Sequence, residues 1–156
     1  MSIQLSTAGV TLNYCVETTS GTRPTTGYTK IPEVKSIPEL NPEPDTLDST
    51  TLEATEYRTY IAGLKDMGGS LGITANLTQD SMDTWDTVVE AYDTAAAANK
   101  AMWFCVIVPG LTNALYFTGQ PSPMGLPSMD VSAVLETTLY ITPTGEPTWA
   151  AKPTSV

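Results

Sequence analysis

The sequence contains no histidine and only two cysteines, Cys15 and Cys105. Histidine is the commonest general base, binds metals and activates serine and cysteine nucleophiles, so its absence argues against enzymes of these kinds. The two cysteines lie far apart and form no CxxC motif, which favours free packing thiols, with a disulfide as the alternative. We therefore expect no catalytic residue, no metal site and no cofactor.

Phosphate-binding glycine loops and long apolar runs are also absent. The Gly68-Gly69 pair lacks the lysine and threonine of a P-loop. Glu43, Asp45 and Asp48 lack EF-hand spacing, which favours loop solvation over a metal site; two acids brought together by folding, as in a glycosidase, remain an alternative. No run approaches the roughly 18 apolar residues of a membrane span, and the first ten residues do not resemble a signal peptide. We expect a soluble protein made in the cytoplasm and not bound to a membrane.

Basic residues are scarce, since seven stand against seventeen acids and give a net charge of −10. Such a surface repels the phosphates of nucleic acids, so stable binding of DNA or RNA is disfavoured. Repulsion is still useful to a protein that must let nucleic acid pass.

Alternating and apolar segments predict a mainly β protein. Period-2 alternation predicts half-buried strands at residues 10–17, 71–78 and 129–142, and the apolar run at 102–108 predicts a core strand followed by a hairpin to 115–120. Residues 28–36 predict an edge strand interrupted by Pro32. The tail, residues 143–156, is turn-rich and is expected to hold a last short strand or a second docking arm around Trp149.

One helix is predicted, with Asp80 or Ser81 as its N-cap and its end near Asn99. Its packing face consists of residues at helical spacing, namely Trp85, Val88, Val89 and Tyr92. Five acids form a stripe on the other side, for which a solvated face is favoured over a functional surface. We expect a single α+β domain over residues 1–156, a β-sandwich or partly open barrel with one flanking α-helix.

A long inter-strand loop, predicted as a protruding arm over residues 37–62, interrupts this pattern. Its prolines and lack of a sustained period argue against a helix or central strand. It nevertheless carries large apolar residues, unlike a disordered linker. We expect an arm that docks on a partner; the alternative is a long surface loop packed on its own domain. The anchors are Ile37, Leu40, Leu47, Leu52, Tyr57, Tyr60, Ile61 and Leu64.

The segment from Ile31 to Gly69, IPEVKSIPELNPEPDTLDSTTLEATEYRTYIAGLKDMGG, resembles the major tail tube proteins of long-tailed, siphovirus-type bacteriophages. The resemblance covers about forty contiguous positions, and the order of the remaining elements agrees with it. It implies a virion protein, assembled in the host cytoplasm, that forms hexameric rings stacked into a tube for DNA ejection. The implied partners are further copies of this chain, the tape measure, tail tip and tail terminator proteins, and DNA in transient, non-binding passage.

The resemblance also implies roles for particular residues. The arm would be the ring-stacking loop, with Ile37, Leu40, Leu47, Leu52, Tyr57, Tyr60 and Ile61 as contacts. Because the inner surface of the family is a sheet, acids on strand faces are the candidates for the lumen, with an outer-surface position as the alternative: Glu17, Asp130 and Glu136.

Two other functions stay open at this stage. The chain is also compatible with a β-sandwich binding or adhesion module of a virion or cell surface, with the 37–62 loop as its recognition element. Within the virion, a tail terminator would form one ring and stop. Self-assembly into tubes distinguishes a tail tube protein from a binding module and from a tail terminator.

Overall fold

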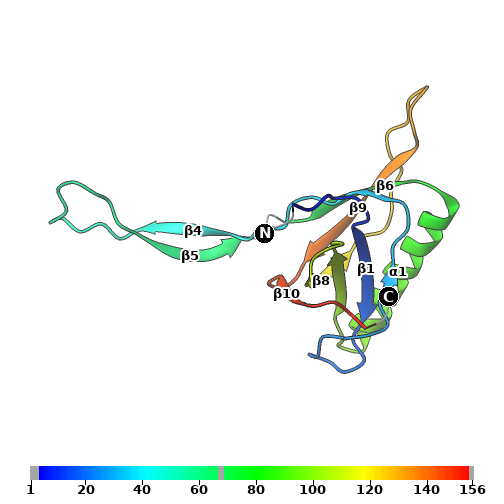
Figure 1. Cartoon of the computed structure of the whole chain (residues 1–156), viewed down its shortest axis with the longest axis horizontal. Helices are drawn as coiled ribbons and strands as arrows, with labels where there is room; N and C mark the ends of the chain where they lie inside the picture. The colour runs from blue at the N-terminus through cyan, green and yellow to red at the C-terminus, as the bar shows by residue number, and fades with distance from the viewer. Residues whose placement is uncertain (1–3, 67–68, 155–156) are drawn as a thin grey trace.

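The computed structural model describes residues 4–66 and 69–154 of the chain and consists mainly of β-strands. The helix is α1 (Gln79–Ala97), and the strands are β1 (Thr11–Val16), β2 (Thr29–Lys30), β3 (Val34–Ser36), β4 (Glu43–Asp48), β5 (Tyr60–Asp66), β6 (Leu71–Asn76), β7 (Met102–Ile107), β8 (Asn113–Pro121), β9 (Glu136–Pro143) and β10 (Thr148–Ala151). Figure 1 shows a body of strands and one helix, from which the β4–β5 hairpin projects.

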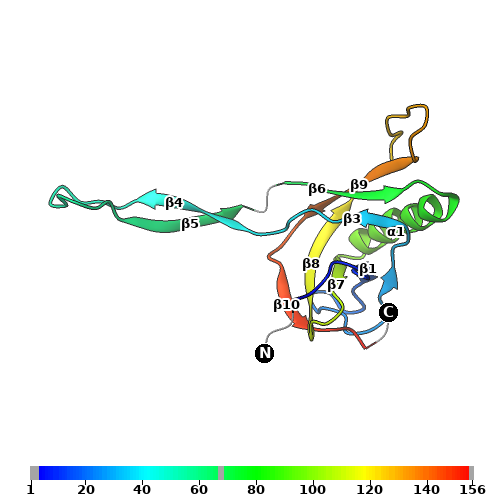
Figure 2. The ribbon, with the colours of Figure 1, turned by 45° about the horizontal axis from the view of Figure 1, so that its top comes forward.

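The body is one curved antiparallel sheet with the strand order β2-β1-β7-β8-β9-β6-β3. Its two edges, β2 and β3, are consecutive in the chain and are separated only by residues 31–33. Such a short link can join the two edges only because the sheet curls round into a half-barrel (Figure 2). The expected α+β, mainly β class with a partly open barrel and one flanking helix is confirmed.

The expected edge strand at residues 28–36 is in fact two strands at opposite edges. Pro32 lacks a backbone donor, and Glu33 adopts a left-handed conformation with φ of 64°. The Ile31 amide donates to the Leu12 carbonyl at 2.9 Å, whereas the Glu33 carbonyl accepts from the Asn76 amide at 2.9 Å. The Pro32-Glu33 step therefore carries the chain from one edge to the other.

The main core lies between the sheet and α1. Trp85 and Val88 are fully buried there, and Val89 and Tyr92 are partly buried against the same core. The Trp85 Nε1–H donates to the Ser122 carbonyl at 2.8 Å. The N-cap is Thr78, so both predicted caps were wrong. Ser81 instead completes a capping box with Thr78, which satisfies two free amides of the first turn.

Strand β8 is flanked on one side by β7 and on the other by β9 and β10 in succession. Gly119–Pro121 pair with β9, and Asn113–Tyr116 pair with β10. The tail therefore holds a strand around Trp149. Gly119 permits close packing here, because a Cβ at this position would lie 2.5 Å from Ile141 Cγ2.

The expected long strand at residues 129–142 is wrong in its first half. Strand β9 begins at Glu136, and residues 122–135 form an exposed loop in which Ser132 has a φ of 67°. Leu139 and Ile141 are buried as expected, whereas Val131 is 96% exposed and Leu135 is 42% exposed. The apolar residues at 131–135 continue the alternation of β9, but no element in the described part of the chain covers their side chains.

A second, smaller cluster covers the other face of the sheet. Tyr28, Cys105 and Tyr116 are buried in it, and the Arg23 guanidinium lies 4.5 Å above the Tyr116 ring. Both thiols are free, as the sequence predicted; Cys105 is buried and Cys15 is half-buried. The cluster fastens the 18–27 loop to the sheet.

Candidate functional site

The arm is a two-stranded antiparallel hairpin rather than the irregular loop expected from the sequence. Leu47 lies opposite Ile61 and Asp48 opposite Tyr60, with a register shift between Pro44 and Thr46. A proline in a ladder requires an edge or a bulge, and this strand has both. Figures 1 and 2 show the hairpin pointing away from the body, with no other element beside it.

Both faces of the hairpin carry apolar side chains. Because paired residues share a face, Leu47 and Ile61 lie on one side, whereas Tyr60 lies on the other, and Leu64 lies in the register shift between them and the root. Leu64 is 85% exposed, and the other three are more than half exposed. A two-stranded hairpin without a covered face is marginal in water, so this geometry favours a partner that covers it.

The tip, residues 49–59, is closed by hydrogen bonds. The Ser49 amide donates to the Thr59 carbonyl at 2.9 Å. The Thr50 amide donates to Asp48 Oδ1 at 2.9 Å, and hydrogen bonds from Thr50 lower the pKa of Asp48. Leu52 and Tyr57 have no such role, and both side chains are almost completely exposed.

Two of the predicted stacking residues lie at the root of the arm instead. Ile37 and Leu40 are partly buried and pack against the main core. They hold the root to the body, so the projecting apolar surface is smaller than predicted. Its members are Leu47, Leu52, Tyr57, Tyr60, Ile61 and Leu64.

Glu17, a predicted lumen acid, is buried, and only 5% of it is exposed. Its carboxylate accepts hydrogen bonds from the Ala101 amide at 2.7 Å and from Trp103 Nε1–H at 3.2 Å. Burial alone would raise the pKa of Glu17, but the hydrogen bonds from Ala101, Trp103 and the Gly21 amide outweigh burial and lower it. Because Glu17 is buried, the predicted position of this residue on the lumen surface is wrong. Its contacts instead tie the end of β1 to the start of β7.

The other two predicted lumen acids differ from each other. Glu136 forms an ion pair with Lys35 across the β9–β6–β3 region, which neutralises its charge locally. Asp130 lies on the exposed 122–135 loop and not on a strand face. The structure therefore does not bring these three acids together on one sheet surface.

The whole excess of negative charge is concentrated in two parts of the chain. Residues 37–66 contain seven acids and two bases, and α1 contains five acids and no base. The rest of the chain contains five acids and five bases, so it is neutral. The arm and the helix are thus two acidic elements on a neutral body.

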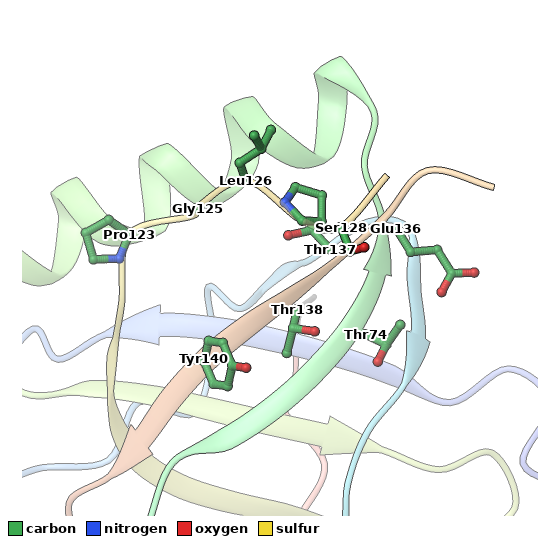
Figure 3. Close-up of a pocket in the computed structure, with 10 residues that line it drawn as sticks. Thr74, Pro123, Gly125, Leu126, Ser128, Glu136, Thr137, Thr138 and Tyr140 are labelled. Carbon is green, nitrogen blue, oxygen red and sulfur yellow. The ribbon is translucent and has the colours of Figure 1, made fainter. Parts of the chain in front are cut away.

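An open groove lies beside the first half of β9, which sequence reasoning missed (Figure 3). It has a volume of about 630 Å³. One wall is the segment after β8, including Pro123 and Leu126, and the other is β9 with Thr138 and Tyr140, next to which Thr74 of β6 also lines the groove. No sequence signal marks this groove, because it results from the place at which β8 and β9 separate.

The described residues contain neither a cluster of metal ligands nor a membrane-spanning helix. Among the described residues, no group of three or more histidine, cysteine, aspartate or glutamate side chains is arranged to hold a metal ion. No helix within residues 4–66 and 69–154 is long and apolar enough to cross a membrane.

Comparison with known proteins identifies the fold. Neither protein-family models nor curated proteins match this sequence. The structure is similar to a chain in the cryo-EM structure of the anti-feeding prophage baseplate, 6-fold symmetrised, with a TM-score of 0.65 and 12% sequence identity. The match covers 97% of this chain and 98% of that chain. The chain therefore shares, over nearly its whole length, the fold of a protein chain in that baseplate structure.

Proposed function

We propose that this chain is a structural virion protein whose copies form six-membered rings, and that these rings stack into a phage tail tube for DNA ejection. The observation that carries the proposal is the arm. It projects from the body with apolar side chains bare on both faces. A docked partner would stabilise such a hairpin, and copies of the same chain supply one in a stacked tube.

Two further observations support a phage tail assembly. The fold is that of a chain in a six-fold symmetrised prophage baseplate structure. The segment that resembles tail tube proteins, residues 31–69, includes the whole hairpin. Fold likeness alone does not carry function, so the arm and its sequence are the specific part of the argument.

The charge of the chain suits a conduit. A net charge of −10 per subunit disfavours retention of DNA, since a basic wall would hold phosphates through counterion release. The proposed interaction with DNA is passage without binding. Tape measure, tail tip and tail terminator proteins are the further proposed partners, and the role requires no catalytic residue.

Electron microscopy of the purified protein at high concentration, combined with light scattering, tests the proposal. Tubes with a regular axial repeat, or six-fold rings that stack, are the expected result. A protein that stays monomeric at every concentration, and also when mixed with preformed tail tips, contradicts it. That outcome favours a binding module that uses the arm for recognition.

A further inference from the structure

The ladder between β8 and β9 ends early and leaves part of β9 open. The last rung is the hydrogen bond from the Ser122 amide to the Tyr140 carbonyl, at 2.9 Å. Beyond it, residues 136–139 pair with β6 on one side, and no strand in the described part of the chain pairs with them on the other. The body therefore contains a half-strand with a free edge in the middle of its sheet.

The direction of the backbone groups defines what this edge offers. In an antiparallel strand, alternate residues direct both N–H and C=O to the same side. Since the Tyr140 carbonyl points toward β8, the backbone groups of Glu136 and Thr138 point the same way, into the groove. The Leu135 carbonyl points to the opposite side, where it accepts from the Leu77 amide. The groove thus presents a short row of backbone donors and acceptors, which is what an added strand requires.

The groove forms an open slot beside this edge of β9. The chain leaves β8 at Ser122 and runs past Pro123, Gly125 and Leu126 before it returns to β9, so it forms the far wall (Figure 3). Helix α1 lies behind the slot, and the side chains of Thr138 and Tyr140 form its β9 wall. An extended segment placed here would have a ladder on one side and apolar and polar side chains around it.

The arm of the same chain is badly placed to fill this slot. Both ribbon views show the hairpin leaving the body on the side away from the start of β9. An arm and a slot at different ends of one molecule form a heterologous pair, which joins copies head to tail. This is the relation that a stack of rings requires.

Composition favours β5 over β4 as the inserted strand. Strand β4, EPDTLD, carries three acids and Pro44, which cannot donate to a ladder. Strand β5, YIAGLKD, has no proline, and it carries Lys65. Lys65 offsets Asp66, so β5 is neutral, whereas β4 carries three negative charges. The helix behind the slot carries five acids and no base, so β5 meets less repulsion there than β4. In the free subunit Lys65 has only a 3.7 Å contact with Glu146, both exposed, which costs little to break.

We propose that the open edge of β9, residues 136–139, receives strand β5 of a second copy, so that the arm of one subunit continues the sheet of the next. The inference rests on the proposed function, of which it specifies the receiving surface. It assigns ring stacking to backbone pairing at a defined edge, with the apolar side chains of the arm covered as a consequence.

Thr138→Pro tests the backbone pairing directly. The Thr138 N–H points into the groove and not to β6, so its loss leaves the ladder of the subunit intact. We expect the Thr138→Pro protein to have the far-ultraviolet circular dichroism spectrum of the natural chain and to be monomeric in solution. It should not form tubes. Thr138→Val, which keeps the N–H, is the matched control and should still assemble. Normal tube growth by a folded Thr138→Pro protein overturns the inference.

Photo-crosslinking provides a second measurement that does not depend on the folding of a proline variant. A benzophenone amino acid replaces Ala62, an exposed residue of β5, and assemblies are grown from a mixture of 14N- and 15N-labelled chains. The expected adduct joins position 62 to a peptide within residues 122–140 and has mixed isotope labels. Tubes whose adducts map elsewhere, or only within one chain, overturn this inference and leave the tube function standing. Absence of any ring or tube contradicts both.

Discussion

The carboxylate of Glu17 accepts a 2.7 Å hydrogen bond from the backbone N–H of Ala101, a residue 84 positions later in the sequence. The contact joins the residue directly after β1 to the loop that leads from α1 into β7. It is charge-assisted and buried, so it fastens two distant parts of the body at one point.

Acid should weaken the subunit through this contact. Because the pKa of Glu17 is lower in the folded protein than its ordinary value of 4.5, the unfolded state binds more protons below that value. The stabilisation is therefore complete above about pH 5 and is lost as the pH falls through the folded-state pKa. Glu17→Gln should cost about 1.5–3 kcal/mol at neutral pH, the contribution of a hydrogen bond to a charged group.

Urea unfolding of the natural chain and Glu17→Gln from pH 7 to acid measures this. The gap between the two proteins should narrow as the pH falls. A gap that is the same at every pH would show that the charge of Glu17 has no part in stability. Glu90→Gln, on the exposed side of α1, is a control that should change little.

Gly119→Ala should destabilise the body by about 1–3 kcal/mol, the usual cost of overpacking. The new Cβ would lie 2.5 Å from Ile141 Cγ2 and 3.3 Å from the Phe104 ring. Gly125→Ala is a matched control, because a Cβ there meets nothing within 4 Å. Chemical denaturation should therefore separate the two variants, and equal midpoints would contradict the packing at β8.

The two thiols should differ in reactivity. Burial raises the pKa of Cys105 to about 11, and burial also raises that of Cys15. The thiolate is the reactive form, so Cys105 should resist an aromatic disulfide reagent at pH 8 until the protein unfolds. The half-buried Cys15 should react slowly but first. Fast reaction of Cys105 in the folded protein would contradict its burial against Tyr28 and Tyr116. The Cys15→Ser variant, which retains only Cys105, identifies which thiol reacts.

Replacement of residues 43–66 by a short glycine-serine linker should leave the body folded and prevent tube growth. The hairpin contributes no buried residue to either core cluster, so its removal costs little stability. Microscopy and thermal unfolding measure the two effects. Leu40→Ala is the opposite control: it trims a side chain packed at the root and should lower stability while tubes still form. Tube growth without the hairpin would contradict the role of the arm.

Sequence periodicity predicted the body well because the chain covers its own strands there. Leu71, Ile73 and Ala75 alternate with half-exposed residues and are buried as expected, since they belong to the core cluster that also contains Trp85 and Val88 of α1. The helix was found for the same reason. Its start was misplaced by a few residues, because Thr78, Asp80 and Ser81 are all good N-caps and only the folded first turn decides among them.

Periodicity failed where the chain leaves its own apolar side chains exposed. Strands β4 and β5 show no single apolar face, so no period of two appears, although a ladder forms. Residues 129–135 show the reverse: Val131 and Leu135 continue the phase of β9, but both side chains are exposed and no strand forms over these residues. In both segments pairing and exposure depend on which elements the fold brings alongside, which local sequence does not contain.

The acids show a similar limit. Glu17 and Glu136 occupy strand positions that looked alike in the sequence, yet one is buried on backbone donors and the other is paired with Lys35. Both partners are brought in by β-pairing across long sequence distances, so only the fold distinguishes them.

The order of the strands along the chain has a consequence for synthesis on the ribosome. The hairpin at residues 43–66 is translated before β7, β8 and β9, whereas β1 must wait for β7 as its central neighbour. A nascent chain therefore exposes the residues of the arm long before it has a body on which another arm can dock. If copies join through that body, polymerisation begins only when translation is complete, so neighbouring chains on one messenger do not join prematurely.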